Sequence, residues 1–273
     1  MTDFAEFGRA EYAGWGTPEV ASAYASGFAT AAQQCVPGLV AAVRAGPYAK
    51  ALDVCCGQGI VSSGLESAGA EVTGLDFSPA MLDLARSNIS GVEFMEGDAT
   101  ALPFEDGSFD AVTMGFGILH IPDSERAISE ARRVLRPGGR FAYSAWHGPE
   151  VSPAFRIVFG SIGKHGDPTV VLPAGPPIHA YADPSVAFPA LENAGFKAPV
   201  LDTVDCAWMV DDPATPFDYF LNGTVRGALL LRAQPDTNKS AIRTAVIETI
   251  ISEFGEAGPW RIPIPAAIVS ATA

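Results

Sequence analysis

Residues 51–59 read Ala-Leu-Asp-Val-Cys-Cys-Gly-Gln-Gly, an apolar run that ends abruptly at two glycines. Such a run is typical of a buried strand that leads into a tight loop. Leu65 and the small residues between Gly59 and Gly69 then predict the first helix. Backbone N–H groups converge where such a helix begins, so we expect a phosphate or carboxylate of a ligand to bind there.

An acidic residue ends the next predicted strand, residues 71–76. Asp76 lies about 20 residues beyond Gly57, the spacing at which a carboxylate accepts hydrogen bonds from a ribose diol. The loop and Asp76 together indicate a nucleoside-bearing cofactor. Ser62 stands where the dinucleotide fingerprint has its third glycine, so the close approach of a pyrophosphate is not indicated.

Four motifs follow one another between residues 50 and 147. They are Leu52-Asp-Val-Cys-Cys-Gly-Gln-Gly59, Gly74-Leu-Asp-Phe-Ser78, Gly97-Asp-Ala99 followed by Leu102-Pro103, and Leu135-Arg-Pro-Gly-Gly139. In this order they resemble the class I S-adenosylmethionine (SAM)-dependent methyltransferases of the ubiquinone- and menaquinone-biosynthesis type. The chain departs from that family at Cys55 and Cys56, where the family usually has a single cysteine or an alanine before Gly-x-Gly.

The resemblance implies contacts to SAM from several parts of the chain. The glycine loop faces the methionine portion, the residues after the second strand hold the ribose and adenine, and those after the third and fourth strands flank the adenine edge and the sulfonium. An N-terminal helix covers the cofactor in the family, which would bring Tyr24 and Phe28 to the pocket; core packing is the alternative role for both. The implied cofactor contacts are Tyr24, Cys55, Gly57, Gln58, Gly59, Asp76, Phe77, Asp98, Ala99, Met114 and Phe116.

The chain continues as alternating strands and helices. Helices are predicted to begin at Ser78-Pro79 and at Asp123, and strand patterns occupy 92–95, 109–114 and 141–146. This order predicts an α/β fold with a doubly wound, seven-stranded, mostly parallel sheet that is Rossmann-like. Residues 262–270 would supply its last, antiparallel strand, although two prolines argue against a central position for their first half.

Helices are also expected before the sheet. Thr17-Pro18-Glu19 predicts a helix near 18–34, and another is expected near 37–45. Residues 20–43 are uncharged, but polar residues and Pro37-Gly38 divide them into pieces shorter than the roughly 20 apolar residues of a membrane span. No basic segment and apolar core precede a cleavage site, so no signal peptide is expected.

An inserted cap is expected after the fifth strand. Residues 148–199 hold nine of the 22 prolines, which favours irregular structure folded over the sheet edge. Two further helices are predicted at 216–232 and 239–254. The expected organisation is an N-terminal helical cover (1–49), a SAM-binding core (50–147), and cap segments with the last two strands of the same domain (148–273).

The composition limits the expected partners. The 31 acidic and 17 basic residues give a formal charge of -14, whereas nucleic-acid binding draws most of its affinity from Lys and Arg. We therefore expect a small-molecule substrate and no nucleic acid, and the oligomeric state stays open. Four cysteines in 273 residues do not suggest a disulfide framework. Cys35 and Cys206 are isolated and are expected to be buried reduced thiols in a cytoplasmic protein.

The leading hypothesis is methyl transfer from SAM to a small molecule. The four histidines lack metal-binding spacing, and no Gly-x-Ser-x-Gly elbow follows a strand, which disfavours a zinc site and a hydrolase triad. Three alternatives stay open. They are an NAD-dependent oxidoreductase, which Ser62 disfavours, a SAM-binding enzyme that catalyses elimination or rearrangement, and a non-catalytic SAM-binding regulator.

Two histidines are candidates for proton removal. His120 follows the fourth strand and His147 ends the fifth, so both should project from the sheet edge at which such folds bind ligands. Histidine accepts a proton near neutral pH. The alternative is that either ring only hydrogen-bonds a backbone group.

The acceptor is expected to be largely apolar, and aromatic or prenylated. Residues 148–225 contain only Arg156, Lys164 and Lys197 as basic residues, which disfavours a phosphorylated or polycarboxylate acceptor. Two or three of the aromatic residues outside the core should touch it, because such pockets are mainly apolar. The aromatic set is Phe155, Phe159, Trp208, Phe217, Tyr219, Phe220 and Trp260, with Phe217, Tyr219 and Phe220 favoured as substrate contacts because they cluster at a helix start.

Overall fold

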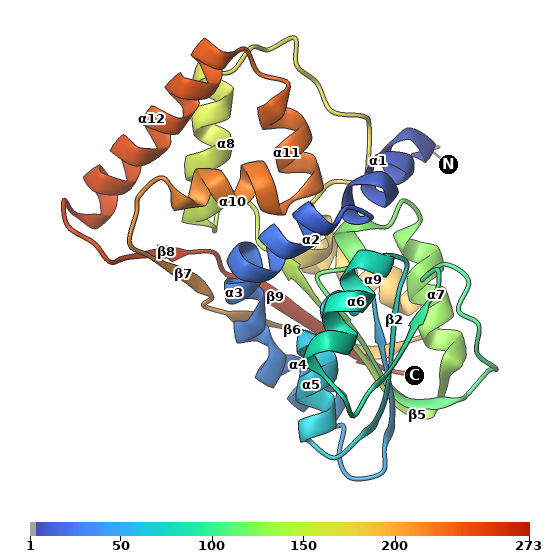
Figure 1. The fold of residues 1–273 in the computed structure, drawn as a ribbon. Helices are drawn as coiled ribbons and strands as arrows, with labels where there is room; N and C mark the ends of the chain where they lie inside the picture. Colours follow the sequence, from blue (N-terminus) through green and yellow to red (C-terminus); the bar gives the residue numbers. More distant parts are fainter. Residues whose placement is uncertain (1–3) are drawn as a thin grey trace.

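The computed structural model describes residues 4–273, built around a seven-stranded sheet of order β3-β2-β1-β4-β5-β9-β6 (Figure 1). Strands β1 to β5 are parallel, and β9 lies antiparallel between β5 and β6. The predicted α/β sheet with an antiparallel last strand is therefore confirmed. The strands are β1 (Lys50–Val54), β2 (Glu71–Asp76), β3 (Glu93–Glu96), β4 (Phe109–Gly115), β5 (Leu135–Trp146), β6 (Lys197–Val204) and β9 (Ala266–Thr272).

Helices cover both faces of the sheet because successive strand side chains point to opposite sides. The small residues Ala51, Ala111 and Ala142 share a core with α4 (Val36–Val43) and α5 (Ile60–Ser67). Their larger neighbours Leu52, Val112 and Phe141 share the other core with α7 (Ser124–Val134) and α9 (Pro184–Asn193). α6 (Pro79–Asn88) packs beside β3.

The N-terminal segment runs over the carboxyl ends of the parallel strands. The helix predicted near 18–34 is divided into α2 (Pro18–Ala23), a π-helical turn η1 (Tyr24–Phe28), α3 (Ala29–Ala32) and a 3₁₀ turn η2 (Gln33–Cys35). Such π-helical turns are frequent at functional sites. The sequence did not predict the preceding helix, α1 (Ala5–Trp15). Across residues 4–273, no helix has both the length and the apolar character needed to cross a membrane.

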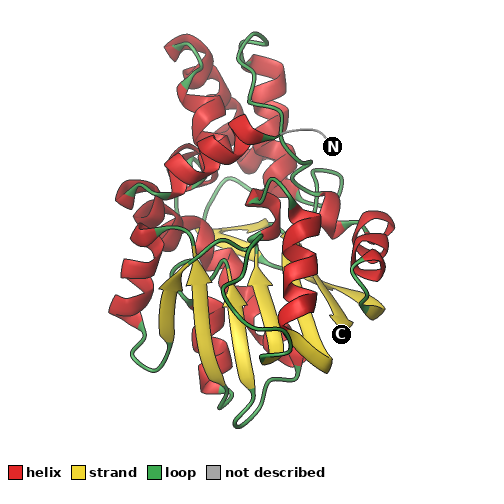
Figure 2. Ribbon diagram, turned by 90° about the vertical axis from the view of Figure 1, so that its right-hand side faces the viewer, coloured by secondary structure: helices red, strands yellow, loops and turns green. Residues whose placement is uncertain are grey.

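A helical cap lies beyond the same edge, the one toward which the arrows of the parallel strands point (Figure 2). Within it, α8 packs along α12, and α10 packs against α11 and η1. A two-stranded sheet, β7 (Ala207–Val210) and β8 (Trp260–Pro263), joins the cap to the core. The cap helices are α8 (Pro153–His165), α10 (Thr215–Gly223), α11 (Val225–Arg232) and α12 (Asp236–Phe254), and short 3₁₀ turns occur at η3 (Ile118–His120) and η4 (Ala180–Ala182).

The prediction of irregular structure over residues 148–199 was wrong in part. Ser152 and Asp183 cap α8 and α9 by accepting hydrogen bonds from Phe155 N and Ser185 N, and each is followed by a proline at the first helical position. Proline is tolerated there because that N–H has no helical partner. The helix predicted at 216–232 is likewise two helices, divided at an extended Thr224.

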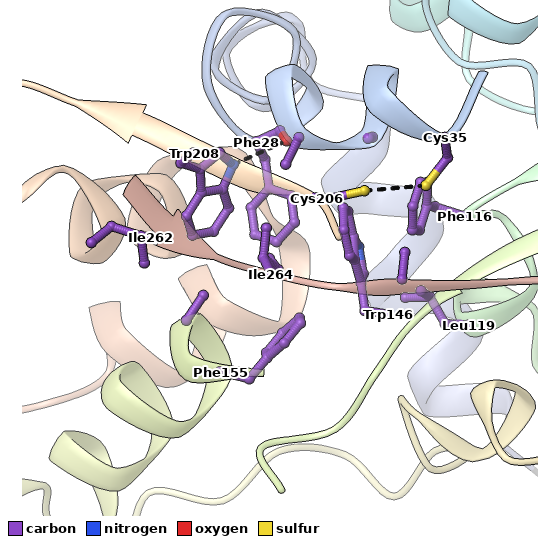
Figure 3. Close-up of a cluster of buried hydrophobic side chains, with 14 of the residues drawn as sticks. Phe28, Cys35, Phe116, Leu119, Trp146, Phe155, Cys206, Trp208, Ile262 and Ile264 are labelled. Atoms are coloured by element: carbon purple, nitrogen blue, oxygen red, sulfur yellow. Dashed lines mark hydrogen bonds between the residues drawn. The ribbon is translucent and has the colours of Figure 1, made fainter. Parts of the chain in front are cut away.

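The two isolated cysteines meet in a buried cluster where the N-terminal helices join the cap (Figure 3). Both thiols are buried, as predicted, but Cys35 Sγ lies 3.4 Å from Cys206 Sγ. Beside them, the Trp208 indole N–H donates to the carbonyl of Phe28 over 3.4 Å. This contact is one way in which the cap sheet holds the N-terminal helices in place.

Gly59 begins α5 with a φ of +86°, and a Cβ added there would lie 2.5 Å from Ile89 Cδ1. We predict that Gly59→Ala lowers the free energy of unfolding by about 1–3 kcal/mol, because left-handed backbone strains alanine and the added methyl group needs room. Gly160→Ala is the control. It lies on an exposed face of α8 with no atom near the added Cβ, so it should be neutral or stabilising by about 0.5–1 kcal/mol. Urea unfolding measures both, and equal stabilities of Gly59→Ala and the wild type would contradict the prediction.

Candidate cofactor and acceptor site

The glycine loop after β1 is held by backbone hydrogen bonds and by one carboxylate. Cys55 and Gly57 both have a φ of +54°, which turns the chain sharply out of the sheet. Gly57 N donates to Asp76 Oδ2 over 2.8 Å, and Ser78 N donates to Asp76 Oδ1 over 2.9 Å. Asp76 at the end of β2 therefore joins the loop to the start of α6, and each of its oxygens keeps a lone pair for a ligand.

A second carboxylate lies beneath the loop. Asp53 is 1% exposed and accepts hydrogen bonds from Ser62 Oγ over 2.6 Å and from Thr113 Oγ1 over 2.9 Å. Burial raises the pKa of Asp53 to about 6, against the lowering effect of these hydrogen bonds. Burial also raises the pKa of Asp76. Two buried carboxyl groups in one site favour a cationic guest, since a positive charge would stabilise their ionised forms.

The loop borders the first of three adjoining cavities, here called the loop cavity. Its floor includes Asp53, Asp76 and the loop, and Trp15 and Tyr24 close it from the N-terminal helices. The second, the edge cavity, extends along the ends of β2 and β3, where Tyr12 stacks on Phe77 with ring centroids 5.4 Å apart. The remaining edge-cavity residues include Asp98, Ala99 and Thr100.

The third cavity, the aromatic chamber, lies between the loop cavity and the cap. Phe116 forms part of the wall between them, stacking on Trp146 with centroids 4.0 Å apart. Its φ of +57° is rare for an aromatic residue, and such strain clusters at functional sites. The backbone N–H of Phe116 donates to Ser144 Oγ over 3.1 Å. The aromatic side chains of the chamber are Trp15, Tyr24, Phe28, Phe116, Trp146, Phe155, Phe159 and Phe220.

His120 borders all three cavities. Its Nδ1 lies 2.8 Å from Oε2 of Glu11, which is buried in α1 and also accepts a hydrogen bond from Trp15 Nε1 over 2.9 Å. Arg226 of α11 supplies a cationic side chain to the chamber. Its guanidinium donates to the carbonyl of Pro176 over 3.1 Å and lies 5.1 Å from the ring centroid of Phe7.

Most of the cofactor contacts expected from the sequence lie together. Tyr24, Cys55, Gly57, Gln58, Asp76, Phe77 and Phe116 line the loop cavity, and Asp98 and Ala99 line the edge cavity. Gly59 is buried at the first turn of α5. Met114 instead points into the core beneath α7, because alternation along β4 turns it to the opposite face.

Only some of the expected catalytic and substrate residues border the cavities. His120 lies at the junction of the cavities, whereas His147 borders none of the three, and its Nε2 lies 3.1 Å from Thr203 Oγ1. Phe220 lines the chamber with Phe155 and Phe159. Phe217 is buried in the core, Tyr219 packs on Trp208, and neither borders the chamber.

Sequence reasoning did not identify Glu11, Trp15, Trp146 or Arg226. The spacing of Glu11 and Trp15, one helical turn apart, was the available signal for the first pair. Trp146 directly precedes His147, and strand alternation directs only Trp146 to the chamber. Throughout residues 4–273, no cluster of three or more His, Cys, Asp or Glu side chains could hold a metal ion.

Comparisons with known proteins agree with this geometry. Residues 52–143 match the family described as methyltransferase domain. A demethylmenaquinone methyltransferase of Renibacterium salmoninarum is 41% identical over 121 residues, which are 44% of this chain and 51% of that protein. A Staphylococcus aureus enzyme of the same name is 50% identical over 97 residues, 33% of this chain and 40% of that protein. The chain thus spans about half or less of the length of these curated relatives.

Solved structures resemble the chain over a longer stretch. YcgJ from Bacillus subtilis superposes with a TM-score of 0.57 at 19% identity, covering 87% of this chain and 97% of that one. At this identity the likeness concerns the fold alone. The family match contains the glycine loop, Asp76 and Phe116, which build the loop cavity. Residues 52–143 therefore form a methyltransferase domain, similar in sequence to part of the demethylmenaquinone methyltransferases.

Proposed function

We propose that this protein transfers a methyl group from SAM to a small, largely apolar acceptor of the quinone type. The observation that carries the proposal is the shared wall of Trp15, Tyr24, Phe116 and His120, at which the loop cavity meets the aromatic chamber. A cofactor in the loop cavity and an acceptor in the aromatic chamber would touch only there. The demethylmenaquinone methyltransferases named above support this choice of acceptor.

The residues present fit SAM. Asp76 keeps two lone pairs for the ribose hydroxyls, and the glycine loop borders the space in which the methionine portion would lie. Phe77 and Tyr12 offer aromatic faces to the adenine. The cationic sulfonium and ammonium groups suit the nearby carboxylates and the faces of Trp15, Tyr24 and Phe116.

SAM supplies an already activated methyl group, so the protein contributes chiefly positioning. The chamber would hold the acceptor in line with the departing sulfur and exclude water. His120 would accept the proton that the acceptor loses. In this proposal the unit 1–49, of which residues 1–3 lie outside the described chain, supplies the helical cover through residues 4–49. Residues 50–147 form the SAM-binding core and 148–273 the cap with the last strands, and His147 has no part in the chemistry.

The test of this function is a methylation assay with reduced demethylmenaquinone and SAM. We expect equal amounts of methylated quinone and S-adenosylhomocysteine, measured by mass spectrometry. Conversion of an acceptor without S-adenosylhomocysteine would favour elimination or rearrangement, and bound SAM without turnover of an acceptor panel would favour a regulator. Either result would contradict methyl transfer.

We predict that Asp76→Asn weakens SAM binding by about 10- to 100-fold, because hydrogen bonds to a charged group contribute roughly 1.5–3 kcal/mol. The amide retains one oxygen for the loop, so the fold should persist, which circular dichroism can check. Asp83→Asn is the matched control, since Asp83 is exposed on α6. Isothermal titration calorimetry measures the affinities, and equal affinities of Asp76→Asn and the wild type would argue against the assigned ribose contact.

We predict that SAM affinity rises with pH between about 5 and 7. Asp53 has a pKa of about 6 in the protein without a ligand. A bound cation lowers that pKa because it favours the ionised carboxylate. Binding therefore releases a proton near pH 6, and affinity falls by up to about tenfold for each pH unit below 6. Calorimetry in buffers of different ionisation enthalpy measures this release. Asp53→Asn should remove much of the dependence, and an affinity that does not vary with pH in the wild type would refute the linkage.

A further inference from the structure

Glu11 of α1 is a buried carboxylate to which the proposed methyl transfer assigns no role. It is 2% exposed, and within the described chain its Oε1 has no hydrogen-bond partner. Its other oxygen serves both Trp15 Nε1 and His120 Nδ1. Burial of a carboxylate is unfavourable unless it is well paired, so α1 would gain little stability from this residue alone. A role at the site explains its position better.

The contact defines the protonation of His120. An ionised carboxylate only accepts hydrogen bonds, so the proton in the 2.8 Å contact belongs to Nδ1. In the neutral ring Nε2 is then unprotonated and can accept a proton. Trp15 Nε1 lies 3.4 Å from His120 Nδ1 but only 2.9 Å from Glu11 Oε2, so the carboxylate oxygen is the better acceptor for the indole N–H as well. The indole also packs edge-on against the imidazole, with centroids 5.1 Å apart. Both contacts restrict the ring to one orientation.

We propose that Glu11 is a positioning residue, which holds His120 in the Nδ1–H tautomer so that Nε2 takes the proton from the acceptor. This inference rests on the proposed function. As the bond from the acceptor to the methyl carbon forms, the bond from that carbon to sulfur breaks and its electron pair stays on sulfur. The acceptor's proton moves to Nε2, and the imidazolium faces the Glu11 carboxylate. The acceptor is therefore one that must lose a proton, such as a hydroquinone.

The charged groups around His120 agree with this role. Glu11 faces it from α1, and Asp76 at the end of β2 interacts with it electrostatically. Arg226 on α11 interacts with Glu11, although the two form no ion pair within the described residues. Two carboxylates therefore face the ring that takes the proton, and Arg226 places a positive charge in the surroundings of Glu11.

A purely structural role is the competing explanation, since Glu11 also ties α1 to the core. The test therefore reads the His120 tautomer directly in the free protein, from ¹⁵N chemical shifts assigned with the His120→Asn variant. Wild type should show Nδ1–H, and Glu11→Leu should lose that preference. Glu11→Gln should retain part of it, because its carbonyl oxygen can still accept from Nδ1–H.

Turnover of reduced demethylmenaquinone then measures the consequence. Glu11→Leu and His120→Asn should each lower kcat by about 100-fold, with the KM for SAM unchanged, and Glu11→Gln should lie between Glu11→Leu and the wild type. Glu6→Gln is the control, since Glu6 is exposed on the same helix. An Nε2–H tautomer in wild type, or an Nδ1–H tautomer retained in Glu11→Leu, would overturn the inference. If the tautomers are as expected but the wild type does not methylate the quinone, the proposed function is overturned. The inference that Glu11 sets the tautomer of His120 would then remain valid.

Discussion

The site depends on the pair of hydrogen bonds that the Asp76 carboxylate accepts from the backbone. Its two oxygens accept from Gly57 N and Ser78 N, so one side chain fixes both the glycine loop after β1 and the first turn of α6. The left-handed backbone of Cys55 and Gly57 then carries the loop out of the sheet and along the wall of the loop cavity. Because these carboxylate oxygens have lone pairs to spare, the group that holds the loop also suits a ribose.

The second half of the site depends on packing between distant segments. The chamber needs α1, the π-helical turn, the end of β5 and the cap helices α8, α10 and α11 to meet over the sheet. Phe116 separates it from the loop cavity, and His120 reaches both. His120, the proposed proton acceptor, therefore lies where methyl donor and acceptor would meet, and Glu11 of α1 contacts its Nδ1.

The sequence predicted those features that local interactions decide. The glycine loop, the Ser78 cap and Asp76 follow from backbone geometry within a few residues, and the order of strands follows from the alternation of elements. Met114 and Phe116 were both expected at the sulfonium, but alternation along β4 turns Met114 into the core. Ser152-Pro153 and Asp183-Pro184 begin helices, so the high proline content of this segment does not by itself indicate irregular structure. Glu11, Trp146 and Arg226 reach the site only through tertiary packing. The one-turn spacing of Glu11 and Trp15 indicates a shared helix face but not what that face contacts.

The most direct test of the account is native mass spectrometry of the freshly purified protein, before and after addition of SAM. The account predicts that each chain carries one SAM or S-adenosylhomocysteine, either on purification or after SAM is added. It also predicts that added NAD does not displace this ligand. Retention of NAD, or a chain that stays free of any adenosyl ligand in excess SAM, would contradict it.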